Sequence, residues 1–438
     1  MTEKRELEEK EADIPPPKAA KVEEETESAA VTATPASDGP KKPPKQRMAV
    51  LFGYCGTGYK GSQINPGQPT IEKDLLDALV KAGAVGELNN DPKKVGLNRC
   101  ARTDKGVHAA GNVISAKLLA IDNLVEKVNA CLPPQIRIFD AFQVNSSFNA
   151  KNHCGGRQYE YSLPTYLLRL SKHELYPHSN LPEVVGQTAT KDTEISSTVG
   201  APWVVLESYE DICKYRLDSE SLEHLRSCLK EYQGTHNFHN FTVGCKFKEK
   251  NAGRYITSFM ACDPYVRSNG VEWISLRVNG QSFMLHQIRK MVGLAVMMVR
   301  TKTPPSLIQE AYKEQKINIP KAPALGLLLR KPTFDAFNKQ QNMQHTGRKS
   351  LEFDNYPNFP TKKELVNPFV EEWINKDMYN EEQEKQVYKN WAFHVDEHSL
   401  NYAWWLTKDG SVRLDLKPAE VSGEDNDDEG QKLAKEDE

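Results

Sequence analysis

Short apolar runs alternate with amphipathic stretches along residues 48–335, and this alternation constrains the fold more than any other feature. The first six segments are predicted as a strand, a helix, two strands, a helix and a strand, at 48–54, 70–82, 95–101, 112–118, 122–132 and 136–144. Two prolines close the second helix. The order β-α-β-β-α-β is that of the ferredoxin-like split βαβ unit.

A second, looser set of segments follows the first. We predict a strand at 158–163, an irregular insertion at 166–218, a helix at 219–231, strands at 255–262 and 271–278, a long apolar helix at 283–299 and a final strand at 324–329. The sequence thus predicts an α/β (α+β) fold. Its two ferredoxin-like mixed α/β halves, residues 48–148 and 149–337, are expected to lie on either side of a basic cleft.

Both ends of the chain depart from this pattern. Residues 1–40 lack aromatic side chains and are rich in Glu, Ala, Pro, Thr and Lys, so the segment 1–47 is predicted to be disordered. The acidic tail, 411–438, is predicted to be disordered for the same reason. Residues 338–410 carry several aromatic side chains, and we expect a helical C-terminal extension packed on the outside of the two halves.

Charge is spread unevenly along the chain. Residues 1–40 hold 11 acidic and 5 basic side chains, and residues 418–438 hold 9 acidic and 2 basic ones. Removing both ends from the totals of 57 basic and 60 acidic side chains leaves 50 and 40, a net charge of +10 for 41–417. A basic body suits a polyanionic partner, because Lys and Arg neutralise phosphates and release counterions. A solvated charged surface explains the same balance and stays open as an alternative.

The eight cysteines occur without a Cys-x-x-Cys pair, so their spacing predicts neither a zinc finger nor a redox motif. With no signal-peptide pattern, an intracellular, reduced protein is expected. The Glu-rich start argues against a mitochondrial transit peptide, and the longest apolar run, 291–299, is too short to cross a membrane. The basic run at 41–47 is either a nuclear import signal or a solvated linker.

The segment Arg-Cys-Ala-Arg-Thr-Asp-Lys-Gly-Val-His-Ala at 99–109 concentrates charge between two predicted strands. One interpretation is a plain turn at 104–106, because Asp suits a bend and Gly accepts positive φ. The other is a functional carboxylate, Asp104, at the mouth of a cleft. Nearby cations favour the ionised form of a carboxyl, which is the form that attacks an electrophile.

Two further segments carry candidate site residues. Arg157, Tyr159 and Tyr161 alternate on one predicted strand, which is either a half-buried strand face or a place where Tyr159 stacks on an unstacked base. Arg289 stands on the apolar helix at 283–299, where a charge must either reach the surface or find a partner, for which Asp104 is the candidate. Gly293 in the same helix indicates close packing.

These segments together resemble the tRNA pseudouridine synthase A family, and most closely its eukaryotic nuclear and mitochondrial branch. The family signature Arg-Thr-Asp-Lys/Ala-Gly-Val-His is present at 102–108, and the motif Gly-Tyr-x-Gly-x-x-Tyr-x-Gly-x-Gln at 53–63. Further matches follow in family order at 148–151, 157–161, 234–241, 283–293 and 322–327. Departures from many bacterial members, at Cys55, Ser62 and Lys151, concern the choice of substrate rather than the chemistry.

The resemblance implies an isomerase that converts uridine to pseudouridine in tRNA. Asp104 resembles the family's nucleophile, and Tyr159 the tyrosine that stacks on the target uracil. Arg289 resembles the basic partner of the aspartate, and Arg102 the arginine that helps to hold the target nucleotide out of the helix. The implied targets lie in and near the anticodon stem and loop, with small nuclear RNA and mRNA as further substrates.

The same resemblance implies RNA as the partner and no cofactor or metal, since the reaction is a redox-neutral isomerisation. We expect a monomer in the nucleus, with mitochondrion and cytoplasm as alternative locations. Two other functions are weighed against this one. A non-catalytic RNA-binding protein of two ferredoxin-like modules would bind without isomerising, and a glycosidase would require a second carboxylate facing Asp104.

Overall fold

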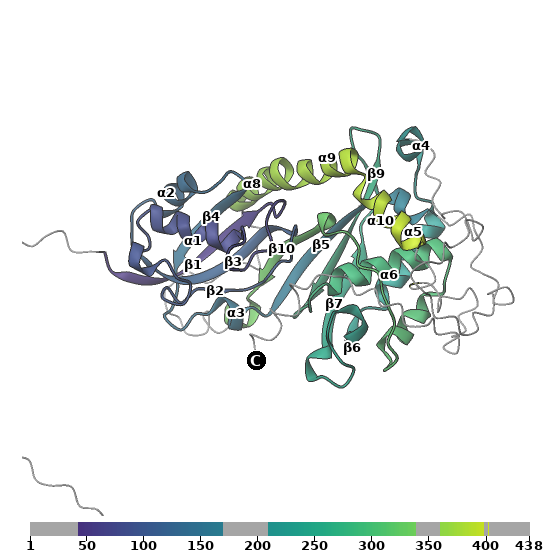
Figure 1. The fold of residues 1–438 in the computed structure, drawn as a ribbon, viewed down its shortest axis with the longest axis horizontal. Helices are drawn as coiled ribbons and strands as arrows, with labels where there is room; N and C mark the ends of the chain where they lie inside the picture. Colours follow the sequence, from purple (N-terminus) through teal and green to yellow (C-terminus); the bar gives the residue numbers. More distant parts are fainter. Residues whose placement is uncertain (1–42, 170–208, 339–359, 398–401, 403–438) are drawn as a thin grey trace, which may run out of the picture. The chain divides into compact units, whose positions relative to one another are not determined.

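A mixed ten-stranded sheet runs through the part of the chain that the computed structural model describes, residues 43–169, 209–338, 360–397 and 402 (Figure 1). Its strands are β1 Lys45–Tyr54, β2 Asn98–Arg99, β3 His108–Leu119, β4 Ile136–Gln143, β5 Gly156–Pro164, β6 Gly234–Asn237, β7 Gly253–Ala261, β8 Tyr265–Val266, β9 Glu272–Gly280 and β10 Leu327–Thr333. The predictions for residues 1–42, for the tail 411–438 and for most of the insertion concern residues outside the described ranges.

The strand order confirms the predicted α+β fold. The path is β4-β1-β3-β10-β5-β9-β7-β6, with β2 paired to β3 and β8 paired to β9. The first half thus has the order β4-β1-β3-β2, and the second half repeats it as β10-β5-β9-β7, which is the ferredoxin-like arrangement twice. A short parallel pairing of Leu328 and Leu329 with His108 and Ala109 joins the halves into one sheet.

Each half contributes a pair of helices that packs on the sheet. In the first half α1 Ile71–Lys81 packs on α2 Leu124–Cys131, which also contacts β4. In the second half α5 Ser219–Lys230 packs on β7 and on α6 Gln287–Thr301. Thr70 occupies the N-cap position of α1, but its side chain makes no capping hydrogen bond.

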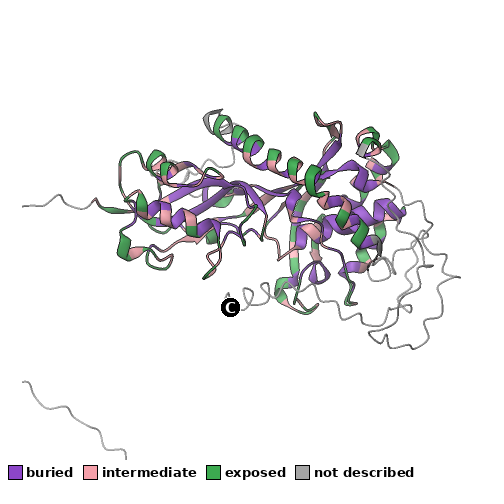
Figure 2. Ribbon diagram, turned by 45° about the horizontal axis from the view of Figure 1, so that its top comes forward, coloured by how far each residue is buried: buried purple, intermediate pink, exposed green. Residues whose placement is uncertain are grey.

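Helix α6 is the most deeply buried of these elements (Figure 2). All of its residues except Arg289 are buried, which agrees with a helix that is apolar over most of its circumference. Gly293 explains how close the packing is, because a Cβ there would come within 2.2 Å of the Pro320 carbonyl oxygen. The prediction of close packing at Gly293 is therefore confirmed.

Several helix and strand bounds differ from the sequence prediction, and the structure adds the strands β6 and β8, which were not predicted. Helix α6 begins at Gln287 rather than at residue 283, because His286 has a φ of +62° and a left-handed residue interrupts a right-handed helix. The strand expected at 95–101 shrinks to Asn98–Arg99, and the one expected at 324–329 begins only at Leu327.

The described part of the C-terminal extension is helical, as expected. It comprises α8 Pro360–Phe369, a π-helical turn Val370–Asn375, α9 Lys376–Lys385 and α10 Val387–Glu397. These elements touch both halves. In the first half the Phe369 ring packs edge-on against Phe139 at 5.5 Å. In the second half the Tyr388 hydroxyl donates to the Ser162 carbonyl at 2.6 Å. Trp404 and Trp405 lie outside the described residues. Across the described ranges, we find no helix with the length and hydropathy of a membrane span.

Candidate active site

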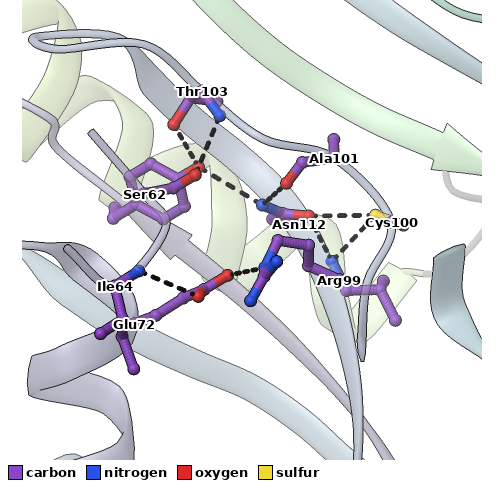
Figure 3. A network of polar contacts seen from close by, with 10 residues as sticks. Ser62, Ile64, Glu72, Arg99, Cys100, Ala101, Thr103 and Asn112 are labelled. Atoms are coloured by element: carbon purple, nitrogen blue, oxygen red, sulfur yellow. Dashed lines mark hydrogen bonds and ion pairs between the residues drawn. The ribbon is translucent and has the colours of Figure 1, made fainter. Parts of the chain in front are cut away.

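The loop between β2 and β3, residues 100–107, carries most of the signature motif at 102–108. A network of buried polar contacts holds this loop to the neighbouring strands (Figure 3). The Asn112 side-chain amide on β3 donates to the Ala101 carbonyl at 3.0 Å, and its carbonyl accepts from the Cys100 thiol at 3.0 Å. The Tyr54 hydroxyl on β1 lies 2.8 Å from the Thr103 hydroxyl. All these groups are buried, so the base of the loop is held rigidly.

A second set of bonds ties this loop to the 53–63 motif. The Thr103 backbone N–H donates to the Ser62 hydroxyl at 2.9 Å, and the Ser62 N–H donates to the Thr103 carbonyl at 3.0 Å. Gly61 has a φ of +109°, and a Cβ there would approach the Thr103 carbonyl oxygen to 3.2 Å. The glycine therefore permits both the backbone turn and the close approach of the two loops.

Arg157 fastens the loop from the second half. Its Nε and Nη2 donate to the Cys100 carbonyl at 3.1 and 2.6 Å, and its Nη1 donates to the Gln281 carbonyl at 2.6 Å. Arg157 lies at the start of β5, the strand that also carries Tyr159. One guanidinium thus connects the signature loop of the first half with the end of β9 in the second.

Asp104 lies at the tip of the loop and is partly buried. The Val107 N–H donates to the Asp104 carbonyl at 3.1 Å, and Gly106 has a φ of +74°, so the turn interpretation is correct for the backbone. The carboxylate itself points to the second half, where its Oδ2 lies 3.0 Å from Nδ1 of His286. The Asp104 side chain is 26 % exposed and the His286 side chain 10 % exposed, so this contact is largely shielded from water.

The electrostatic surroundings of Asp104 favour the carboxylate. Burial alone raises the pKa of the Asp104 carboxyl, but the hydrogen bond and the charge of His286 oppose this effect. The positive charges of Arg289 and Lys321 act in the same direction as His286, and the pKa lies below its ordinary value. The three side chains that act most strongly on this carboxyl are thus all basic. A glycosidase would place a carboxylate opposite it, and these contacts do not favour that alternative.

Arg289 is held by the segment that precedes β10. Its Nε donates to the Ala322 carbonyl at 2.6 Å, and the Ala322 N–H donates to the Arg289 carbonyl at 3.1 Å. Arg289 is half-buried, and its charge lowers the pKa of Asp104. The structure therefore brings Arg289 and Asp104 together from segments that are 185 positions apart in the chain.

Tyr159 is buried beside the same carboxylate. Its ring meets Phe283 edge-on at 5.3 Å, and Asp104 is close enough to act on its phenol. Burial raises the pKa of Tyr159, so the phenol stays protonated at neutral pH. Arg102, by contrast, is exposed on the signature loop, where its charge acts on Glu72 beneath. Glu72 itself is buried and forms an ion pair with Arg99.

His108, which follows the loop, has a structural role. Its Nδ1 accepts a hydrogen bond from the Gly56 N–H at 3.1 Å, and burial lowers its pKa to about 4. A neutral His108 thus supports the 53–63 motif. Among the described residues no group of three or more His, Cys, Asp or Glu side chains is arranged to hold a metal ion.

Comparisons with known proteins identify the family. A family model described as tRNA pseudouridine synthase matches residues 228–335, which include α6 and β10. Three similar proteins are tRNA pseudouridine synthase 1 of Yarrowia lipolytica, tRNA pseudouridine synthase 1 of Kluyveromyces lactis and Pseudouridylate synthase 1 homolog of Mus musculus. The first is 37 % identical over 413 residues, covering 82 % of this chain and 77 % of the relative. The second is 38 % identical over 402 residues, covering 82 % and 71 %. The third is 35 % identical over 393 residues, covering 89 % and 82 %.

The chain belongs to the tRNA pseudouridine synthase family. It is therefore an enzyme, an isomerase, and the alternative of a non-catalytic RNA-binding protein is set aside. Within this synthase the residues singled out in the sequence, Asp104, Tyr159 and Arg289, lie around one site, whereas Arg102 lies at its exposed edge.

Two neighbours of Asp104 were missed by sequence reasoning, His286 and Lys321. His286 lies three residues before Arg289, inside a segment that was predicted to be helix. A helix starting at residue 283 gives no reason to place His286 beside Asp104, and the left-handed conformation of His286 is visible only in the structure. Lys321 stands next to the 322–327 motif, and its position beside this motif was the one available signal.

Proposed function

We propose that this synthase converts uridine to pseudouridine in tRNA with the Asp104 carboxylate as the nucleophile. The observation that carries the proposal is the placement of Asp104 against three basic side chains, His286, Arg289 and Lys321. These groups keep the carboxyl ionised in a site where burial alone would favour its neutral form. An ionised and partly desolvated carboxylate is the form that a covalent mechanism requires.

The reaction breaks one bond and forms another without net oxidation. The bond between uracil N1 and ribose C1′ breaks, the base turns, and C5 becomes joined to C1′. A proton leaves C5 and a proton is gained at N1. The Asp104 oxygen attacks either C6 of the uracil or C1′ of the ribose, and both routes are compatible with the carboxylate described above. In either route the nucleotide must first be extruded from its helix, at a cost of about a few kcal/mol.

The other residues have roles in binding. Tyr159 offers a ring beside the nucleophile on which the extruded uracil stacks, and its protonated phenol does not serve as a base in the resting enzyme. Arg102, exposed on the same loop, is suited to hold the RNA backbone while the nucleotide is out of its helix. Arg289 and Lys321 help to keep Asp104 ionised.

The experiment that tests the proposal uses tRNA carrying tritium at uridine C5, because loss of the C5 proton releases the label. Asp104→Ala should bind tRNA with the affinity of the wild type and release no tritium. Asp263→Ala is the matched control, since Asp263 pairs with Arg226 on the surface of the second half. Tritium release by Asp104→Ala at a rate near that of the wild type would exclude Asp104 as the nucleophile.

We further propose that the target uridines lie in and near the anticodon stem and loop, and that small nuclear RNA and mRNA are additional substrates. The protein is proposed to act as a monomer in the nucleus, a location supported by the basic run at 41–47. Mapping pseudouridine in RNA from cells that lack the protein tests the substrates. Replacing the basic run with alanine in a fluorescent fusion tests the location.

A further inference from the structure

Three consecutive backbone carbonyls at 321–323 each accept a hydrogen bond from a different element. The Lys321 carbonyl accepts from the indole Nε1 of Trp391 on α10 at 2.9 Å. The Ala322 carbonyl accepts from Arg289 Nε on α6 at 2.6 Å. The Pro323 carbonyl accepts from the Tyr161 hydroxyl on β5 at 2.8 Å. We call residues 321–323 the carbonyl segment.

The carbonyl segment fixes Arg289 in two ways. The bond from Nε sets the orientation of the planar guanidinium, and the Ala322 N–H donates to the Arg289 carbonyl at 3.1 Å. Pro320, which leads into the segment, lies so close to Gly293 that a Cβ there would be 2.2 Å from the Pro320 carbonyl oxygen. A shift of the segment is therefore transmitted to α6 rather than absorbed by a void.

The same segment supplies a second cation. Lys321 is half-buried, and its charge acts on the Asp104 carboxyl together with that of Arg289. Two of the three basic groups that act most strongly on Asp104 thus depend on where the carbonyl segment lies. The third, His286, is fixed separately, because Thr242 donates through its hydroxyl to the neighbouring Leu285 carbonyl at 2.9 Å.

Trp391 is the only one of the three donors that belongs to the C-terminal extension. The extension is also held to the body elsewhere. Asp377 on α9 accepts from the Thr57 hydroxyl at 2.7 Å, and Tyr388 on α10 donates to the Ser162 carbonyl at 2.6 Å. Loss of the indole bond alone therefore leaves the extension docked and removes only the contact with the carbonyl segment.

We propose that Trp391 is a positioning residue for the isomerisation, whose indole N–H holds the carbonyl segment so that Arg289 and Lys321 face Asp104. This inference rests on the proposed role of Asp104 and gives the C-terminal extension a part in the chemistry. Trp391 touches neither the substrate nor the reacting atoms in this assignment. It acts through the backbone of the segment between α6 and β10.

The test compares three variants of the full-length protein. Trp391→Phe keeps an aromatic ring and removes the N–H. Tyr265→Phe is the matched control, because the Tyr265 hydroxyl bonds the Tyr379 hydroxyl of α9 at 2.9 Å, another single contact between body and extension. Trp391→His, which keeps a ring N–H, serves as the rescue variant. For each variant kcat and KM are measured by tritium release from tRNA, and Tm by thermal unfolding.

We expect Trp391→Phe to lower kcat about tenfold with KM within about twofold of the wild type, because a small displacement of positioned groups slows the chemical step more than it weakens binding. Trp391→His should recover part of this loss, and Tyr265→Phe should keep the kcat of the wild type. All of the variants should unfold within a few degrees of one another.

Three results would overturn the inference. These are an unchanged kcat in Trp391→Phe, an equal loss of kcat in Trp391→Phe and Tyr265→Phe, or failure of Trp391→Phe to fold, which would assign the indole a structural role. The role of Asp104 is judged separately. If Asp104→Ala is inactive while Trp391→Phe is fully active, only the inference about Trp391 fails. If Asp104→Ala stays active, the proposed function itself fails.

Discussion

Nδ1 of His286 lies 3.0 Å from Oδ2 of Asp104, although the two residues are 182 positions apart and belong to different halves of the sheet. His286 has a left-handed backbone conformation, with φ +62°, and occupies the N-cap position of α6 rather than its first turn. His286 therefore stands at the start of the buried helix that also carries Arg289, and one helix brings two basic groups to the carboxylate.

The His286 contact predicts a change in the pH dependence of catalysis. Burial raises the pKa of Asp104, and His286 opposes this more than the charges of Arg289 and Lys321 do. In His286→Asn the pKa of Asp104 should therefore rise, and the acid limb of the kcat/KM profile, which reports the free enzyme, should move to higher pH. Activity should fall more at pH 5 than at pH 8. A profile that keeps its shape would exclude this role, and His236→Asn, whose ring stacks on Tyr312 at 4.3 Å, is the control.

Two substitutions of Arg289 distinguish the effect of its positive charge from the effect of its hydrogen bond to the Ala322 carbonyl. Arg289→Leu removes the cation and should lower kcat by about two orders of magnitude, since preorganised charges of this kind are worth about that much. Arg289→Lys keeps the charge but loses the Nε bond to the Ala322 carbonyl, and should fall between Arg289→Leu and the wild type. Single-turnover kinetics on labelled tRNA measures both variants. Full activity in Arg289→Leu would mean that Asp104 does not need this guanidinium.

Tyr159 predicts a contrast between two substitutions. Tyr159→Phe keeps the ring against Phe283 and should bind tRNA as tightly as the wild type. Tyr159→Ala removes the ring and should weaken binding by about 1–3 kcal/mol, the usual value of stacking on a base. Equilibrium binding of the two variants to the same tRNA measures this difference. Equal affinities of the two variants would show that the Tyr159 ring does not bind the base. An unchanged kcat in Tyr159→Phe would show that Tyr159 acts by stacking alone.

The buried carboxyl of Glu382 on α9 should make the folding stability depend on pH, and this effect does not involve the candidate active site. Its carboxyl accepts from the Tyr166 hydroxyl and, at 2.9 Å, from the Tyr388 N–H, and burial raises its pKa to about 7. Because the folded pKa is above the unfolded one, its stabilising contribution is full below about pH 4.5 and is lost as the pH rises through 7. In the wild type the free energy of unfolding should therefore fall by on the order of 3 kcal/mol between pH 5 and pH 8, and in Glu382→Gln this fall should be absent. Urea unfolding measures this, and the exposed Glu384→Gln should leave the dependence intact.

Much of the fold could be predicted from the chain because strands and helices follow local apolar periodicity. The order β-α-β-β-α-β and the apolar helix around Gly293 required only neighbouring residues to be seen together. Where a single backbone conformation interrupts a pattern, as at His286, local periodicity fails and the predicted helix runs too far.

The sequence by itself determined which side chains we propose for the chemistry, since Asp104, Tyr159 and Arg289 stand in motifs whose residue types and order are readable one segment at a time. Only the tertiary structure decided what surrounds the carboxylate. The contacts of His286 with Asp104, of Arg157 with Cys100 and of Trp391 with Lys321 join residues 182, 57 and 70 positions apart. Such contacts form only when segments that are far apart in the sequence pack together in the folded protein. They therefore leave no local pattern in the chain.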